Sequence, residues 1–190
     1  MEFLPITRDG SKVYAGFWRR LGALLVDTVV LVPFVVMFVW LDGLSISSAM
    51  VAAVASVTLF EGYTFYFHAR FGATLGKMVT NIKVTLPNGS PIGFTEAFLR
   101  SSVGLGFSMV ATFARLSAIV NADTEQYLSL DWTGRVEYAS TLVPAWYGNV
   151  EFLGELWLWS EVVVLLFNKH RRALHDFIAG TVVIQKRFAK

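Results

Sequence analysis

The strongest constraint on this chain is a series of apolar stretches, each long enough to cross a lipid bilayer. A hydrocarbon core about 30 Å thick is crossed by about 20 helical residues, because each residue adds about 1.5 Å. The sequence has such stretches at residues 20–41, 47–67, 97–120 and 149–167. The composition agrees, since 55% of the 190 residues are hydrophobic and only 16% are charged. The sequence therefore predicts an all-α membrane protein with four transmembrane helices.

The first apolar stretch is expected to stay in the mature chain. It is longer than the apolar run of a signal peptide, and no small-residue cleavage site follows it. The chain contains no cysteine, so neither a disulfide nor a thiolate metal site can form. The histidines are His68, His170 and His175, and none has the i, i+4 spacing of a helical zinc site. We expect no metal site and no cofactor.

The basic residues are distributed unevenly along the chain. Of the 16 Lys and Arg residues, 14 lie in three segments, 1–20, 68–100 and 168–190, and the other two are Arg115 and Arg135. The positive-inside rule then predicts a multi-pass protein with both termini cytoplasmic and the loop 121–148 outside. We expect it to lie in the cytoplasmic (inner) membrane. This loop is rich in Trp and Tyr, which favour the membrane interface, and we expect a short helix in it. Because the basic residues flank the spans, we expect no nucleic-acid partner.

Two short segments outside the apolar stretches have the pattern of β-strands. Residues 81–85 alternate in polarity and precede a Pro-Asn-Gly turn, and residues 181–186 are β-like but too short to span a membrane. An isolated strand would leave its backbone polar groups unsatisfied, so we expect 81–86 and 181–186 to pair in a small cytoplasmic β element. Residues 173–179 predict a short interfacial helix that ends at Gly180.

Asp27 is a carboxylate within an apolar stretch, and a charge at that depth needs a partner or a water-filled cavity. Arg20 lies two helical turns earlier on the same face. Glu61 and Glu161 lie at a similar depth in their own stretches, and Arg100 can reach the same layer. We therefore expect a buried polar cluster in which Arg20 and Arg100 are the countercharges.

This cluster has two interpretations. Three carboxylates close together cannot all ionise at low cost, so at least one would hold a proton or share a bound cation. In the other interpretation, the same charges form salt bridges that hold the helices together and move nothing.

Three further motifs lie near the cytoplasmic ends of the stretches. Asp176 is expected to tie the short helix to Arg20, Lys77 or a backbone N–H group, while His175 beside it is either half of a proton-handling pair or incidental. Residues 72–77 differ from a phosphate-binding loop in glycine spacing and in having Met78 after the lysine, so we expect a turn at the membrane surface. No group of residues has the arrangement of a catalytic site, and we expect no enzymatic activity.

In order along the chain, the motifs resemble the RDD family of membrane proteins. They are Gly16-Phe17-Trp18-Arg19-Arg20 with Asp27, Thr74-Leu75-Gly76-Lys77, Arg100, and Leu174-His175-Asp176 followed by residues 179–183. That family is named for one arginine and two aspartates, which correspond here to Arg20, Asp27 and Asp176. The resemblance covers most of the chain except residues 116–148. It implies a mostly bacterial family for which transport, including cation/proton exchange, is the usual suggestion.

Two hypotheses of function follow. The first is a small transporter of monovalent cations or protons, in which Asp27, Glu61 and Glu161 bind the ion and the gate is formed by Arg20, Arg100, Lys77 and Asp176. Four helices seldom enclose a pathway alone, so this hypothesis requires a homo-oligomer. The second is a non-catalytic accessory or assembly subunit that binds another membrane protein. In both hypotheses the lipid bilayer is the main environment.

Overall fold

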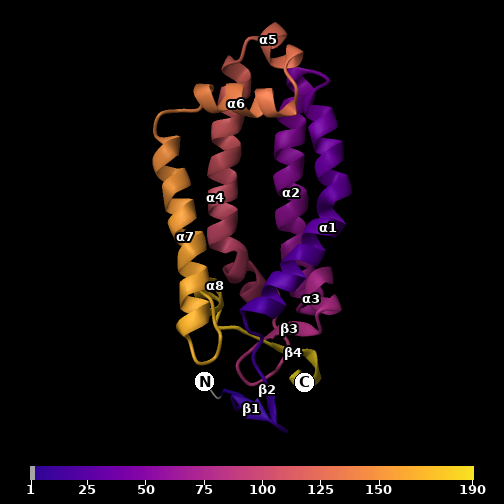
Figure 1. Ribbon diagram of the computed structural model, residues 1–190, viewed down its shortest axis with the longest axis vertical. Helices are drawn as coiled ribbons and strands as arrows, with labels where there is room; N and C mark the ends of the chain where they lie inside the picture. Colours follow the sequence, from indigo (N-terminus) through magenta and orange to yellow (C-terminus); the bar gives the residue numbers. More distant parts are fainter. Residues whose placement is uncertain (1–2) are drawn as a thin grey trace. The chain divides into compact units, whose positions relative to one another are not determined.

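The computed structural model describes residues 3–190, and α-helices dominate it (Figure 1). The longest are α1 (Phe17–Asp42), α2 (Ile46–Phe71), α4 (Phe94–Asn121) and α7 (Tyr147–Phe167). Of these, α1, α2 and α4 have 26, 26 and 28 residues, and each is long and apolar enough to cross a membrane. The prediction of a helical, multi-pass membrane protein is therefore confirmed.

The fourth predicted span, residues 149–167, coincides with α7. This helix has 21 residues, enough to cross a hydrocarbon core at about 1.5 Å per residue. Every 18-residue stretch of α7 contains Glu151, Glu155 and Glu161, whereas α1, α2 and α4 each have a stretch of that length with at most two charged residues. Three candidate spans are supported, and the count of four stays a prediction.

The residues form two compact units, and each unit is built from pieces of the same long helices. Unit 1 consists of Met1–Val30, Tyr63–Val103 and Leu156–Lys190, and unit 2 consists of Leu31–Gly62 and Gly104–Glu155. The chain passes from one unit to the other within α1, α2, α4 and α7. Each unit has its own set of buried charges.

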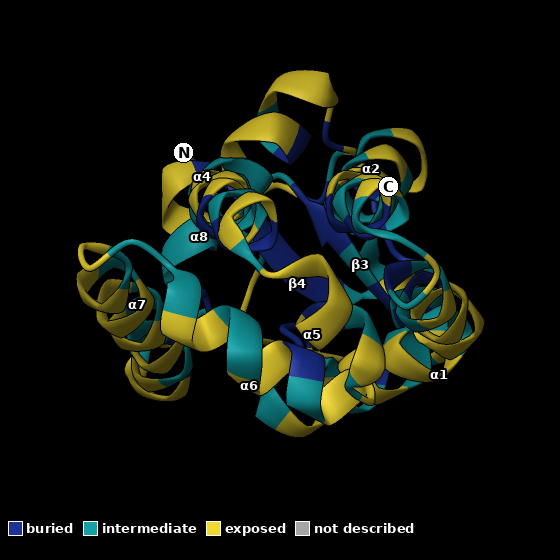
Figure 2. Cartoon of the chain, turned by 90° about the horizontal axis from the view of Figure 1, so that it is seen from above, coloured by how far each residue is buried: buried dark blue, intermediate teal, exposed yellow. Residues whose placement is uncertain are grey.

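Unit 1 has its core at a small antiparallel sheet, whose strands are mostly dark blue in Figure 2. Strand β3 (Ile82–Thr85) pairs with β4 (Val182–Gln185), with Ile82 opposite Gln185 and Thr85 opposite Val182. The apolar side chains of both strands are at most 1% exposed. The predicted pairing is confirmed, because buried strands satisfy their backbone groups by pairing with each other.

The segment before α1 completes this sheet. The Ala15 N–H donates to the Val183 carbonyl at 2.9 Å, so residues 13–15 lie along the free side of β4. Further toward the N-terminus, β1 (Thr7–Arg8) and β2 (Ser11–Lys12) form a hairpin. Its turn residues, Asp9 and Gly10, have φ values of 52° and 72°, and positive φ at both positions is typical of the type I′ turn of a two-residue hairpin.

Two short helices of unit 1 flank the sheet. They are α3 (Leu75–Val79) and α8 (Leu174–Ile178), and a 3₁₀ turn, η1 (Lys186–Phe188), follows β4. The chain leaves α8 through Gly180, whose φ of 65° suits the left-handed position after a helix end. The short helix predicted at 173–179 is therefore confirmed. The turn predicted at 72–77 is present at residues 72–74, and residues 75–77 begin α3.

Unit 2 contains two short helices within the segment 121–148, where the sequence predicted one. Helix α5 (Thr124–Ser129) begins after Asp123 and α6 (Trp132–Leu142) begins after Asp131. Each aspartate caps its helix, since its carboxylate accepts a backbone N–H at 2.8 Å. Tyr127 of α5 is 1% exposed and packs in the core of unit 2.

Candidate functional site

Asp27 of α1 is bound by neutral donors in unit 1. Its Oδ1 accepts the Tyr63 hydroxyl at 2.6 Å and the Gly76 N–H at 2.7 Å. Its Oδ2 accepts the Thr74 hydroxyl at 2.6 Å. Within residues 3–190, no arginine or lysine forms a salt bridge to this carboxylate. The expected pairing of Asp27 with Arg20 and Arg100 is therefore wrong.

The Thr74-Leu75-Gly76 motif brings α3 onto α1 at this carboxylate. Thr74 precedes α3, and its hydroxyl accepts the Lys77 N–H at 3.4 Å while donating to Asp27. A Cβ atom on residue 76 would lie 2.0 Å from the Ala23 carbonyl oxygen and 2.8 Å from Asp27 Cγ. Only glycine permits so close an approach. Asp27 therefore anchors α3, a role that charge patterns alone do not reveal.

The two arginines are bound by Asp176 instead. Arg20 Nη1 donates to Asp176 Oδ2 at 2.8 Å, and Arg100 Nη1 donates to Oδ1. The Ala173 N–H also donates to Oδ2, at 2.9 Å, which fixes the carboxylate at the start of α8. The predicted tie from Asp176 to Arg20 or a backbone N–H is confirmed with both partners, whereas Lys77 is not among its hydrogen-bond donors in the described residues.

Asp176, which pairs with the two arginines, is more deeply buried than Asp27. Its side chain is 0% exposed, whereas Asp27 is only partly buried. Burial opposes the charge of Asp176, but the Arg100 and Arg20 guanidiniums hold its pKa well below the usual range. A fully buried carboxylate needs close countercharges, because an unpaired buried charge is strongly destabilising. This trio, Arg20, Asp176 and Arg100, is called the inner clamp below.

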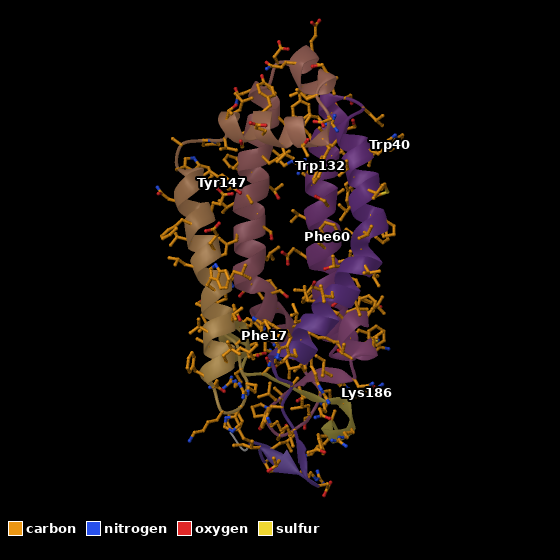
Figure 3. The ribbon with its side chains drawn as sticks, viewed as in Figure 1. Phe17, Trp40, Phe60, Trp132, Tyr147 and Lys186 are labelled. Carbon is orange, nitrogen blue, oxygen red and sulfur yellow. The ribbon has the colours of Figure 1, made fainter. Side chains whose placement is uncertain are left out.

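Glu161 of α7 lies against α8 in unit 1. Its Oε1 accepts the His175 N–H at 3.0 Å, and its Oε2 lies 2.7 Å from His175 Nδ1. Burial, then the charge of Arg100, lowers the pKa of His175, so the ring is neutral at neutral pH. Glu161, His175 and Arg20 are among the residues that line a groove of about 400 Å³, and its other lining residues are apolar. Phe17, labelled in Figure 3, also lines it.

Glu61 of α2 belongs to unit 2. Its Oε1 accepts the Ser108 hydroxyl of α4 at 2.6 Å, and in the described part of the chain it forms no salt bridge. Its level on α2 can be followed from the adjacent Phe60, labelled in Figure 3. Asp27 and Glu161, both in unit 1, have different partners and share none. The structure therefore gives each predicted carboxylate its own surroundings.

Unit 2 contains a second buried aspartate that sequence reasoning missed. Asp42 is 2% exposed, and its carboxylate accepts Arg115 Nη2 at 2.8 Å, Arg135 Nε at 2.9 Å and the Tyr127 hydroxyl at 3.1 Å. Burial, then the Asp42 charge, raises the pKa of Tyr127, so its hydroxyl remains a donor. A signal was present, because Arg115 and Arg135 are the two basic residues that the charge distribution left unexplained. Asp42, Arg115 and Arg135 are called the outer clamp, after the predicted topology.

These features define a class of protein, a multi-pass integral membrane protein with charges paired inside its helical units. The model of the RDD family matches residues 14–180. This range covers most of the chain, and the protein belongs to the RDD family. Comparisons with curated proteins and with solved structures gave no match. Residues 3–190 contain no group of three or more His, Cys, Asp or Glu side chains placed to hold a metal ion.

Proposed function

We propose that this protein moves monovalent cations or protons across the cytoplasmic membrane, without enzymatic activity, and that Glu61 is its membrane-embedded binding residue. One observation carries the proposal. Glu61 lies within an apolar helix, 15 residues after Ile46 and so about 22 Å along the helix axis. Its hydrogen-bond donor is the neutral Ser108 hydroxyl, and none of the described basic side chains pairs with it.

The missing countercharge of Glu61 has an energetic consequence. An ionised carboxylate inside a bilayer is costly unless it pairs with a positive charge or faces water. A bound proton or a bound monovalent cation removes that cost, and release of either restores the need for another. The Ser108 hydroxyl adds a second oxygen from a different helix. A site that alternates between a proton and a cation is the minimum that exchange requires.

The other predicted residues take supporting roles in this proposal. The inner clamp of Arg20, Asp176 and Arg100 holds α8 closed as a gate, and Glu161 offers a second carboxylate beside the apolar groove. Asp27 positions α3, and with it Lys77. The transporter has four spans with both termini cytoplasmic, and it acts as a homo-oligomer because four helices seldom enclose a pathway.

A different role, as an accessory or assembly subunit for another membrane protein, is favoured by the glycines of unit 2. Gly62, Gly104 and Gly106 are exposed, and a Cβ atom at each would meet no atom within 4 Å. Such open glycines let a helix of another chain approach closely. The same faces suit self-association, so they are compatible with the transporter as well.

Flux through proteoliposomes tests the proposal. Protein reconstituted with an internal pH dye is exposed to gradients of Na⁺, K⁺ and Li⁺, and we expect at least one of them to drive proton movement. Glu61→Gln removes the charge and should lower this flux by at least about tenfold, since a neutral amide cannot exchange a proton for a cation. Glu137→Gln, at an exposed position of α6, is the matched control and should leave the flux unchanged.

Two results would contradict transport at Glu61. One is equal flux in Glu61→Gln and the unmodified protein when both show the same elution profile in detergent. The other is an absence of flux for every ion of the panel in the unmodified protein, which would favour the accessory role.

A further inference from the structure

Unit 1 contains two basic side chains in direct contact. Lys77 of α3 and His68 of α2 approach each other with Nζ and Nε2 only 2.6 Å apart. His68 is 2% exposed, and its other ring nitrogen, Nδ1, is buried and has no hydrogen-bond partner within residues 3–190. Lys77 is partly buried and forms no salt bridge to any described carboxylate. Two basic groups are thus held together where an ion pair would be expected.

The short contact limits how many protons the pair can hold. A lysine ammonium has three donors and no acceptor, and a protonated imidazole has donors on both nitrogens. A hydrogen bond between Nζ and Nε2 therefore requires a lone pair on one of them, so the two groups cannot both be charged in this arrangement. The pair holds either one excess proton or none, and it titrates as a unit.

The surrounding groups favour loss of that proton near neutral pH. The charged and titratable groups that face the pair are Arg20 and Asp27 of α1, Arg100 of α4, and His175 and Asp176 of α8. Both arginines are bound to Asp176, and Asp27 is already bound by Tyr63, Thr74 and Gly76. Burial, then the charges of Arg100 and Arg20, lowers the pKa of Lys77 to about 7.

We propose that Lys77 and His68 form a proton-binding site in unit 1, which takes up and releases a single proton through their shared Nζ–Nε2 hydrogen bond. This inference deepens the proposed function, on which its place in transport rests, because an exchanger needs a residue pair that gains and loses a proton under cellular conditions. The backbone holds the site in place, since Gly76 and Thr74 fix α3 against Asp27.

Nuclear magnetic resonance of the lysine amines tests the site directly. The chain has only six lysines, at positions 12, 77, 83, 169, 186 and 190, so side-chain ¹⁵N labelling gives a readable spectrum. In the full-length protein in nanodiscs we expect one signal to change from ammonium to amine between about pH 6 and 8, while the others stay ammonium past about pH 9. That signal should vanish in Lys77→Arg and persist in Lys169→Gln, the exposed control.

The histidine is tested in the same spectrum. His68→Gln replaces the ring nitrogen with an amide oxygen, which accepts hydrogen bonds and cannot take up the proton. The ammonium form of Lys77 should then be stabilised, and the midpoint of the Lys77 titration should rise by at least about half a pH unit. The proposal is overturned if all six lysines of the unmodified protein stay ammonium to about pH 9, or if His68→Gln leaves the Lys77 midpoint unchanged. This experiment reports proton binding whether or not the protein carries flux, so its failure is distinct from the failure of Glu61→Gln to lower transport.

Discussion

Two aspartates of the RDD family motif are stabilised by different kinds of partner in this protein. Asp176 is fully buried and lies between Arg20 and Arg100, while Asp27 is partly buried and accepts hydrogen bonds from a tyrosine, a threonine and a backbone N–H. The first is an ion cluster, and the second is an anchor made of neutral donors. Their substitutions should therefore combine differently with changes at Arg20.

A double-mutant cycle separates the two cases. Arg20→Gln combined with Asp176→Asn should show a coupling energy of about 1 kcal/mol or more, because the two side chains share a buried ion pair. Arg20→Gln combined with Asp27→Asn should be additive within about 0.5 kcal/mol, because these side chains share no contact. The free energies come from reversible unfolding of the purified protein in detergent. Rescue of Asp27→Asn by Arg20→Gln would contradict the hydrogen bonds described here.

The sequence predicted one of these sites better than the other. A buried carboxylate near Arg20 is visible in a charge pattern, and the tie from Asp176 to Arg20 was predicted. The partners of Asp27 are Tyr63, Thr74 and the N–H of Gly76, which carry no charge and lie far away along the chain. Counting charges cannot find neutral donors, so Asp27 was paired with the nearest arginine on its own helix.

Among the elements, local sequence patterns predicted short strands and helices well, but they did not predict contacts between residues far apart in the chain. The pairing of β3 with β4 and the short helix α8 followed from alternation and a terminal glycine. The position of α3 could not be predicted from a local pattern, because it depends on how closely residue 76 packs against the Ala23 carbonyl. Helix α6 depends in the same way on Arg135 reaching Asp42 of α1.

We predict that substitutions in the outer clamp destabilise the protein to different degrees. Asp42→Asn leaves two arginines without their carboxylate and should cost about 3–5 kcal/mol, as expected when one partner of a buried ion pair is removed. Arg135→Gln should cost less, because Arg115 still pairs with Asp42. Arg115→Gln should cost about 1 kcal/mol or less, since its side chain is 43% exposed.

Thermal unfolding in detergent measures the order of these stability losses. Protease sensitivity of the segment 121–148 serves as a local probe. Tyr127→Phe is the mild control, because it keeps the buried ring and removes only the hydroxyl that donates to Asp42. An equal loss of stability in all three charge variants would show that the carboxylate does not organise this end of unit 2.

For the whole molecule, the two units repeat one device. Each buries an aspartate between two arginines, Asp176 in unit 1 and Asp42 in unit 2. Helix α1 contributes Arg20 to one clamp and Asp42 to the other, and α4 contributes Arg100 and Arg115. In each unit, these two long helices are therefore linked through a buried aspartate.

This pairing accounts for the two basic residues that depart from the predicted charge distribution. Arg115 and Arg135 are the two basic residues that the inside-positive arrangement places outside, and both are bound by Asp42. The remaining 14 lie in segments 1–20, 68–100 and 168–190. Two of them, Arg20 and Arg100, belong to the inner clamp, and the other 12 are the basis of the predicted orientation. Because the chain has no cysteine, single cysteines can report it without background.

We expect an impermeant maleimide to label Glu137→Cys in intact cells and to label Lys190→Cys only after the membrane is permeabilised. Glu137 is exposed on α6 and suits this test better than Asp131, whose carboxylate caps that helix. Labelling of Lys190→Cys alone in intact cells would reverse the orientation. Labelling of both would mean an odd number of crossings, with α7 lying outside the bilayer and α1, α2 and α4 as its three spans. The experiment thus decides orientation and span number together, because the three glutamates of α7 set it apart from the candidate spans α1, α2 and α4.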